Sequence, residues 1–183
     1  MDLRERISGR LSKARIEALC EEMRSNVSCR ERLFELTDDA DRRIAYNAYW
    51  VLSHFAAVDN SWLSDKREIL IDRVMVEQND GIRRLILAVL LRLPFDKEHL
   101  RSDFVDYCLE KIPLNRETCA VRVYCLRLAF EQCKFYLELL QELQAVLAML
   151  DGESLPAGLY AARADIRKKW KRCQNCWLFM WWR

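Results

Sequence analysis

The chain has 183 residues, and its 30 Lys and Arg against 28 Asp and Glu give a formal net charge of +2. A charge this close to zero does not demand a polyanionic partner, and an apolar content of 51% excludes a disordered chain. The sequence contains only four glycines and three prolines, which argues against a turn-rich β fold and favours long helices.

Apolar residues recur at helical spacing along the first half of the chain. In the first expected helix, Ile16, Leu19 and Met23 lie at i, i+3 and i+7, which places them on one face. Polar capping residues and turns separate the segments that follow. We expect helices over residues 9–24, 27–36, 40–57, 64–78 and 82–93.

Two prolines, Pro94 and Pro113, divide the second half of the chain into further helices. Between them, apolar residues recur every four positions, as at Leu100, Phe104 and Cys108. We expect helices over residues 97–112, from residue 115, and over 134–150 and 156–171.

A short unit recurs about every 40 residues, and an amphipathic helix follows each copy. The copies read Asp39-Ala40-Asp41-Arg42-Arg43, Asp80-Gly81-Ile82-Arg83-Arg84 and Thr118-Cys119-Ala120-Val121-Arg122. A period of this size is typical of a helical solenoid. We therefore predict an all-α, right-handed α-α superhelix of about four helical hairpins plus an N-terminal helix. Residues 1–172 would form one domain, and residues 173–183 an aromatic-rich tail.

This pattern resembles that of the HEAT-repeat family over about residues 27–171. In that family an acidic residue and an arginine stand at the turn inside a helix pair and form ladders between neighbouring repeats. Asp39 with Arg43, and Asp80 with Arg84, match this arrangement. The third unit lacks the acid, and no unit has the family's frequent proline after it. The resemblance implies that the second helices of the pairs, which start near residues 40, 82, 119 and 157, line a concave face where partners dock.

On the first of these helices, four side chains form a stripe that resembles a contact surface. They are Arg43, Asn47, Trp50 and His54. The alternative is that Trp50 packs between repeats and that Arg43 is the ladder arginine. One unit later, the corresponding positions are Arg84, Ala88, Leu91 and Phe95. These either continue an apolar groove for a partner peptide or helix, or belong to the core.

A basic cluster lies near the end of the chain. It consists of Arg163, Arg167, Lys168, Lys169, Lys171 and Arg172. The cluster is either an exposed helix face or a contact for an anion, on nucleic acid or on an acidic protein. Nucleic acid is the alternative partner, because HEAT-like alkylpurine DNA glycosylases also place tryptophan and basic residues in a concave cleft.

Neither the cysteines nor the C-terminal tail indicates a cofactor, and we expect none. Six cysteines stand singly at apolar or edge positions, and Cys173 and Cys176 form a CxxC pair without the second pair that a structural zinc site needs. The charged first ten residues do not resemble an export signal, so we expect a cytoplasmic protein with reduced thiols. No apolar run is long enough to span a membrane. The tryptophan-rich tail could cap the last repeat, bind a membrane interface or have no role.

No catalytic motif is found. The chain has two histidines, and we expect the neighbouring side chains of Ser53 and His54 to point about 100° apart on a helix and make no nucleophile–base contact. Isolated glycines build no phosphate-binding loop. The sequence therefore predicts a non-catalytic binding or scaffold protein without cofactor or metal, whose partner is a protein or peptide.

Overall fold

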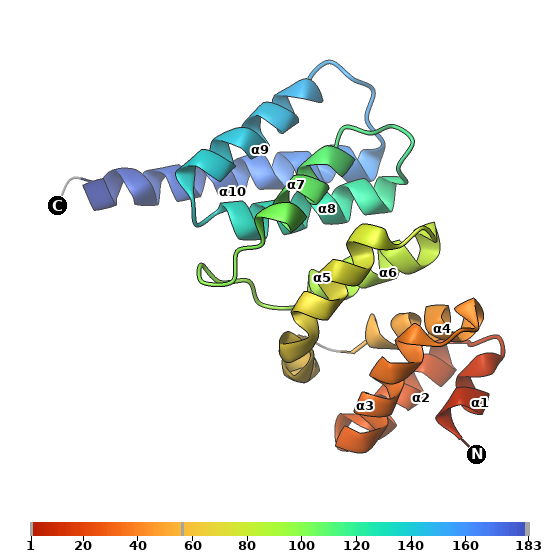
Figure 1. Cartoon of the computed structure of the whole chain (residues 1–183). Coiled ribbons are helices and arrows are strands. Elements are labelled where there is room, and N and C mark those ends of the chain that lie inside the picture. Colours follow the sequence, from red (N-terminus) through yellow and green to blue (C-terminus); the bar gives the residue numbers. More distant parts are fainter. Residues whose placement is uncertain (1, 56, 182–183) are drawn as a thin grey trace. The chain divides into compact units, whose positions relative to one another are not determined.

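The computed structural model describes residues 2–55 and 57–181, except for the side chains of residues 57–61 and 173–181. The described backbone is helical and contains no strand (Figure 1), which confirms the predicted all-α class. The α-helices are α1 (Leu3–Ser8), α2 (Lys13–Arg24), α3 (Val27–Glu35), α4 (Arg42–Leu52), α5 (Arg67–Val76), α6 (Asp80–Leu90), α7 (Ser102–Lys111), α8 (Cys119–Cys133), α9 (Leu137–Met149) and α10 (Ala157–Trp181). Two 3-10 helices, η1 (Leu36–Asp38) and η2 (Ala57–Lys66), precede α4 and α5.

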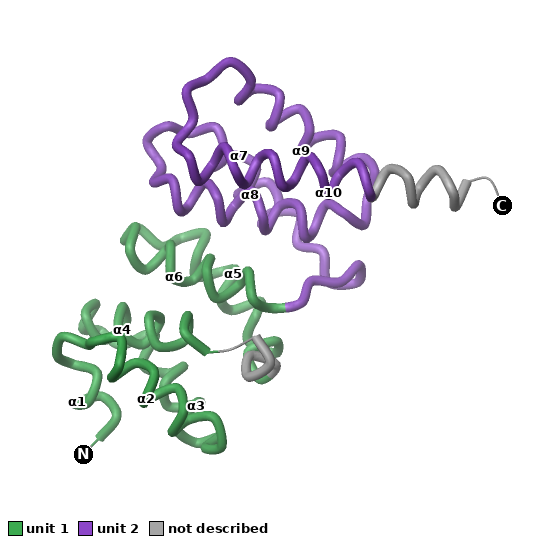
Figure 2. The backbone as a smooth tube through the Cα atoms, turned by 180° about the vertical axis from the view of Figure 1, so that it is seen from behind, with its two compact units in different colours: residues 1–93 green, residues 94–183 purple. Residues whose placement is uncertain are grey.

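The chain forms two compact units, residues 1–93 and 94–183 (Figure 2). The first unit contains α1 to α6 and the second contains α7 to α10. The assignment of residues 1–172 to one solenoid domain stays a prediction. The side chains of the predicted tail, residues 173–183, lie outside the described residues.

Helix α4 is the central helix of the first unit. It packs against α1, α2, α3 and α6, and its Ile44, Ala48 and Leu52 are buried. The helix begins after Asp41, whose carboxylate accepts a hydrogen bond of 2.9 Å from the backbone N–H of Arg43. Helices α3 and α4 form one pair and α5 and α6 the next, so α4 and α6 are the second helices of two successive repeats.

Helix α8 is the central helix of the second unit. It packs against α7, α9 and α10. Phe104 and Cys108 of α7 and Leu126 of α8 are fully buried at this centre. Helix α7 pairs with α8, as the spacing of the prolines and of the repeat unit predicts. The expected pairing of α9 with α10 is less close, since the main helix contact of α10 is with α8.

The sequence pattern does not predict α1. The charged residues around Leu3 and Ile7 obscure these two apolar residues, which lie four apart and are both buried. The buried Leu11 continues the same spacing, and Ser12 then accepts a hydrogen bond from the backbone N–H of Arg15. Helix α2 therefore begins at Lys13, and the helix expected over residues 9–24 is shorter than predicted.

Three further helix ends differ clearly from expectation. Helix α4 ends at Leu52, not near residue 57, because Ser53 Oγ donates to the carbonyl oxygen of Trp50 at 2.7 Å and competes with continued helix. The helix expected over residues 64–78 begins only at Arg67, after η2. At the other end of the chain, α10 extends to Trp181 where residue 171 was expected.

The six single cysteines are free thiols, four of them buried and two, Cys29 and Cys119, half-buried. Burial raises the pKa of Cys133 to about 12 and raises the pKa of Cys108 as well. A thiol reacts as its thiolate, so these buried groups stay protonated and unreactive at neutral pH. The CxxC pair at Cys173 and Cys176 lies outside the described side chains.

A prediction follows for alkylation of the folded chain at pH 8. Cys29 and Cys119 should react with a maleimide at least about tenfold faster than Cys108 and Cys133, because the raised pKa and the burial both suppress the buried thiolates. Peptide mapping by mass spectrometry gives the order. In guanidinium chloride the difference should vanish, and equal rates in the folded protein would contradict the packing of α7 against α8.

Candidate interaction site

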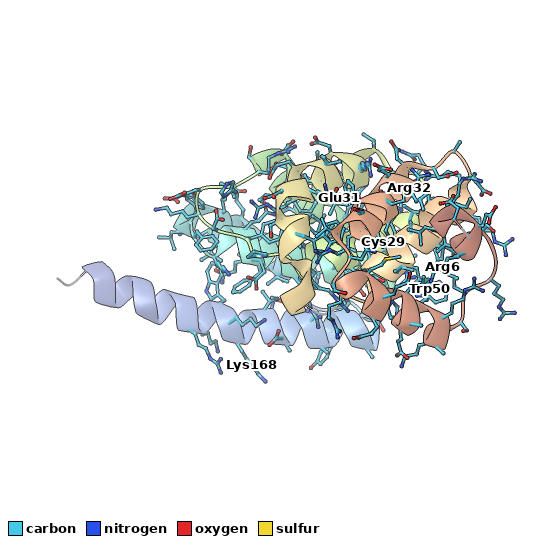
Figure 3. The ribbon with its side chains drawn as sticks, turned by 90° about the horizontal axis from the view of Figure 1, so that it is seen from below. Arg6, Cys29, Glu31, Arg32, Trp50 and Lys168 are labelled. Atoms are coloured by element: carbon cyan, nitrogen blue, oxygen red, sulfur yellow. The ribbon has the colours of Figure 1, made fainter. Side chains whose placement is uncertain are left out.

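An aromatic row runs along α4. Tyr46, Trp50 and His54 lie four residues apart, with ring centroids 6.2 Å apart for the first pair and 6.3 Å for the second. Tyr46 and Trp50 are half-buried, and His54 is exposed. Figure 3 labels Trp50. Among the described residues, the indole N–H of Trp50 has no hydrogen-bond partner. The row therefore presents apolar ring surface and an unused donor.

Asn47 does not belong to this exposed row, which corrects the stripe predicted from the sequence. Its side chain is only 5% exposed. The amide Nδ2 donates to the carbonyl oxygens of Ile7 at 2.7 Å and Gly9 at 3.0 Å. Asn47 therefore holds α1 against α4, and α1 covers the position where a partner contact was expected.

The exposed side chains of α4 form a stripe that differs from the predicted one at one position. Arg43, Tyr46, Trp50 and His54 have spacings of three, four and four, which keep them on one side of the helix. Tyr46 takes the place predicted for Asn47, about 100° further round the helix. The sequence also allows Tyr46 as a member of the stripe, since it lies four residues before Trp50. Only the position of α1, which covers Asn47, decides between Tyr46 and Asn47.

A matching stripe runs along α6. Gly81, Arg84 and Ala88, with Arg92 in the turn just after the helix, repeat the spacings of three, four and four, and all four residues are at least partly exposed. Leu91 is half-buried beside them, and Phe95 is buried, so Phe95 belongs to the core.

Two contacts fix how these stripes lie side by side. At the start of α6, a Cβ on Gly81 would lie 3.0 Å from Cε2 of Tyr46, so the glycine lets the ring approach the backbone. At the other end, Arg92 Nη1 donates to the carbonyl oxygen of Phe55 at 2.5 Å. The two helices are therefore parallel neighbours. We call this surface the aromatic face; it comprises Arg43, Tyr46, Trp50, His54, Gly81, Arg84, Ala88 and Arg92.

The residues that form the ion pair between repeats differ from those that the family pattern implies. Arg42, not Arg43, reaches the next repeat and binds Glu77 at 2.5 Å. Asp39 binds Arg4 at 2.7 Å, which lowers the pKa of that carboxyl group through a side-chain hydrogen bond. A shift of one residue turns a helical side chain by about 100°, so Arg42 faces the neighbouring repeat and Arg43 faces outward.

The predicted contact residues Arg43 and Arg84 are left without a carboxylate. Arg43 is exposed and Arg84 half-buried, and neither forms an ion pair with a described residue; Asp80 binds Arg83 instead. In the second unit the equivalent Arg122 is 3% exposed, and its Nε donates to the carbonyl oxygen of Ile112 at 2.8 Å. Arg122 is therefore a structural residue, whereas Arg43 and Arg84 remain open to a ligand.

Ser53 and His54 lie closer together than expected, with Ser53 Oγ 3.3 Å from His54 Nδ1. Both atoms, however, bond to the carbonyl oxygen of Trp50, at 2.7 Å and 2.9 Å. A ring nitrogen that donates to a carbonyl cannot accept the serine proton. The pair caps the end of α4 and lacks the geometry of a nucleophile with its base.

A polar cavity of about 460 Å³ lies between η1, α4 and α5. Its lining includes Arg42, which binds Glu77, and Arg73, whose Nη1 donates to Thr37 Oγ1 at 2.7 Å. Because these cations are engaged within the chain, the cavity offers a ligand fewer open charges than the aromatic face does.

Part of the basic cluster on α10 is engaged in holding α9. Arg163 Nη1 donates to the carbonyl oxygen of Leu150 at 2.8 Å and to Asp151 at 3.0 Å. Arg167 binds the same carboxylate at 2.8 Å and lowers the pKa of Asp151 through this hydrogen bond. These two arginines cap the negative end of α9, as expected for cations at a helix C-terminus.

The other four cations of the cluster differ in their surroundings. Lys169 pairs with Asp165 at 3.2 Å. Lys168, Lys171 and Arg172 are exposed and form no ion pair with a described residue; Figure 3 shows Lys168 projecting away from α10. Only half of the predicted anion-contact residues therefore remain uncommitted.

The Asp151 contact predicts an acid-sensitive attachment of α9 to α10. The pKa of Asp151 is lowered in the folded chain, so its carboxylate adds to the free energy of unfolding at neutral pH. This stabilisation is lost as the pH falls through the lowered pKa. Asp151→Asn should lower Tm slightly at pH 7, by roughly 1–3 °C, and the difference from wild type should shrink in acid and vanish once the pH is below the lowered pKa. Asp165→Asn is the matched control, and an Asp151 difference independent of pH would contradict the assignment.

The described residues contain no group of three or more side chains suited to hold a metal ion. None of the described helices combines the length and apolar character needed to cross a membrane. A family model described as a HEAT repeat domain matches residues 3–170. No curated protein sequence and no solved structure shows significant similarity to the chain.

Proposed function

Since the chain belongs to the HEAT repeat family, whose helix pairs typically mediate interactions, we propose that it is a non-catalytic binding protein that docks a protein partner on the aromatic face. One observation carries the proposal. The half-exposed Trp50, between Tyr46 and His54, lies on the same face as Arg43 and Arg84, which form no ion pair with a described residue.

The composition of this face supports protein docking. Tryptophan, tyrosine and arginine are the residues that most often dominate binding energy in protein interfaces. Trp50 brings a large apolar area and an N–H that bonds to none of the described residues, so a partner would gain both burial and a hydrogen bond. A cytoplasmic location is part of the proposal, because a reducing compartment suits the free thiols.

Site-specific photo-cross-linking tests the proposal directly. A benzophenone amino acid replaces Trp50 in one variant and Ile69 in a control, since Ile69 is an apolar side chain of α5 that is 45% exposed. Position 50 should capture a discrete protein that resists nuclease treatment, and position 69 should not. Equal capture at both positions would remove the aromatic face as the docking site, and products lost on nuclease treatment would replace the protein partner with nucleic acid.

A further inference from the structure

Charge is sorted between the first and second helices of the first unit. Helix α4 and the segment that follows it to Phe55 contain no Asp or Glu, and α6 has only Asp80, at its first position. The first helices differ: α3 and α5 each carry two acidic and two basic side chains. The second helices therefore present positive charge with almost no negative charge among it.

The ion pairs sharpen this separation. On the first-helix side, Arg32 binds Glu35 at 2.7 Å, Lys66 binds Glu31 at 2.7 Å, and Arg73 lies 3.5 Å from Asp38. On the aromatic face no described carboxylate pairs with the three guanidinium groups, and one of them donates only to a carbonyl oxygen. These three are Arg43, Arg84 and Arg92. The aromatic face is therefore left with a positive charge that no carboxylate among the described residues neutralises.

The positions of the three arginines define the spacing of the groups that a ligand would present to them. Arg43 and Gly81 occupy equivalent places at the starts of two parallel helices, whose axes lie about 8–10 Å apart when packed, and Arg84 lies about one turn further along α6. Arg92 lies eight residues after Arg84, in the turn that follows α6. Trp50 lies between the two ends of this arrangement, because the contact of Tyr46 with Gly81 and that of Arg92 with Phe55 enclose it along the helices.

We propose that the aromatic face recognises an acidic amphipathic helix of a partner protein. The inference rests on the proposed function and specifies its ligand: carboxylates about two helical turns apart, with an apolar side chain between them. One carboxylate would bind at Arg84 and the other at Arg92, with Arg43 adding positive charge at the start of α4, and the apolar side chain would pack against Trp50. A helix suits the face because residues spaced three and four apart form ridges that pack against a second helix.

Chemistry favours this ligand over a nucleic acid. Guanidinium groups bind carboxylates through paired, charge-assisted hydrogen bonds. Nucleic-acid affinity depends on many phosphate contacts, on the order of six to ten for a strong binder, whereas this face has three arginines, one of which already donates to a carbonyl oxygen. The half-buried Trp50 and Tyr46 offer more to an apolar side chain than to a row of stacked bases.

The test uses synthetic helical peptides of about 16 residues, each with one central leucine and two variable positions eight residues apart. The variable positions carry Glu, Gln or Lys. Binding to the ¹⁵N-labelled full chain is followed by NMR, at the Trp50 indole and the arginine Nε–H groups. The Glu peptide should bind at least about tenfold more tightly than the Gln peptide, and the Lys peptide should not bind measurably.

Variants separate this inference from the proposed function. Arg43→Gln with Arg84→Gln should abolish the preference for Glu, whereas Arg15→Gln, an exposed arginine of α2 without an ion pair among the described residues, should not. Equal binding of all three peptides with loss in Trp50→Ala would keep the docking face and overturn its acidic ligand. Failure of every peptide, while position 50 still cross-links a protein, would also overturn only the acidic ligand. Tighter binding of single-stranded DNA of about 12 nucleotides would overturn both.

Discussion

Replacing Asn47 by leucine should loosen α1 and lower the free energy of unfolding by about 1–3 kcal/mol. The amide group donates to the carbonyl oxygens of Ile7 and Gly9, and the Ile7 contact is buried. Leucine has a similar volume but no donor, so the Ile7 carbonyl would remain buried without a partner. Urea denaturation of the full chain gives the free-energy change, and hydrogen exchange of residues 3–8 should accelerate before global unfolding.

Gln141→Leu provides the matched control for this change. It also replaces an amide by leucine, but on an exposed position of α9 with no hydrogen bond to a described residue, so its effect should stay within about 0.5 kcal/mol. If Asn47→Leu left both stability and α1 exchange unchanged but weakened partner binding, the sequence-based assignment of Asn47 to the contact surface would be restored.

Asn47 is a residue whose burial the sequence alone does not predict. The apolar period identifies α4 and its buried side correctly, because Ile44, Ala48 and Leu52 recur every four residues. Which polar residues then remain exposed depends on every helix packed against α4. Helix α1 is six residues long and hidden among charges, and without it Asn47 looks like an exposed neighbour of Trp50.

The ion pairs illustrate a second limit. The repeat unit places Arg42 and Arg43 side by side, and the family pattern alone assigns the ladder to Arg43. The register between repeats gives that role to Arg42, which pairs with Glu77 thirty-five residues later. The repeat period does not distinguish two neighbouring residues such as Arg42 and Arg43. The three-dimensional packing does, and it decides which guanidinium group forms the ion pair and which stays available to a partner.

Charge segregation, in contrast, can be read directly from the sequence. The absence of Asp and Glu from residues 42–55 requires no coordinates, but it was obscured by the near-neutral charge of the whole chain. The more conspicuous basic cluster near the C-terminus proved less informative, because Arg163 and Arg167 are occupied at the end of α9. Exposure and pairing, rather than the number of cations, separate a ligand site from a helix cap.

Trp50→Ala should weaken partner binding by about 2–4 kcal/mol, roughly 30- to 1000-fold, once the protein cross-linked at position 50 is in hand. Truncation removes the ring surface and the indole N–H that a partner would bury. The folded chain should lose less, about 1 kcal/mol, because Trp50 is only half-buried and contacts the Tyr46 and His54 rings at its edges. Titration calorimetry of the full chain with the captured partner measures the affinity.

Tyr160→Ala is the control for this experiment, since it removes an aromatic side chain that is 60% exposed on α10, outside the aromatic face. It should leave affinity unchanged. Trp50→Phe should retain part of the binding, because phenylalanine keeps a ring but lacks the N–H. The three variants together separate ring burial from hydrogen bonding. Affinity unaffected by Trp50→Ala, with circular dichroism unchanged, would show that the partner docks elsewhere and that the Tyr46, Trp50 and His54 row serves only to pack α4.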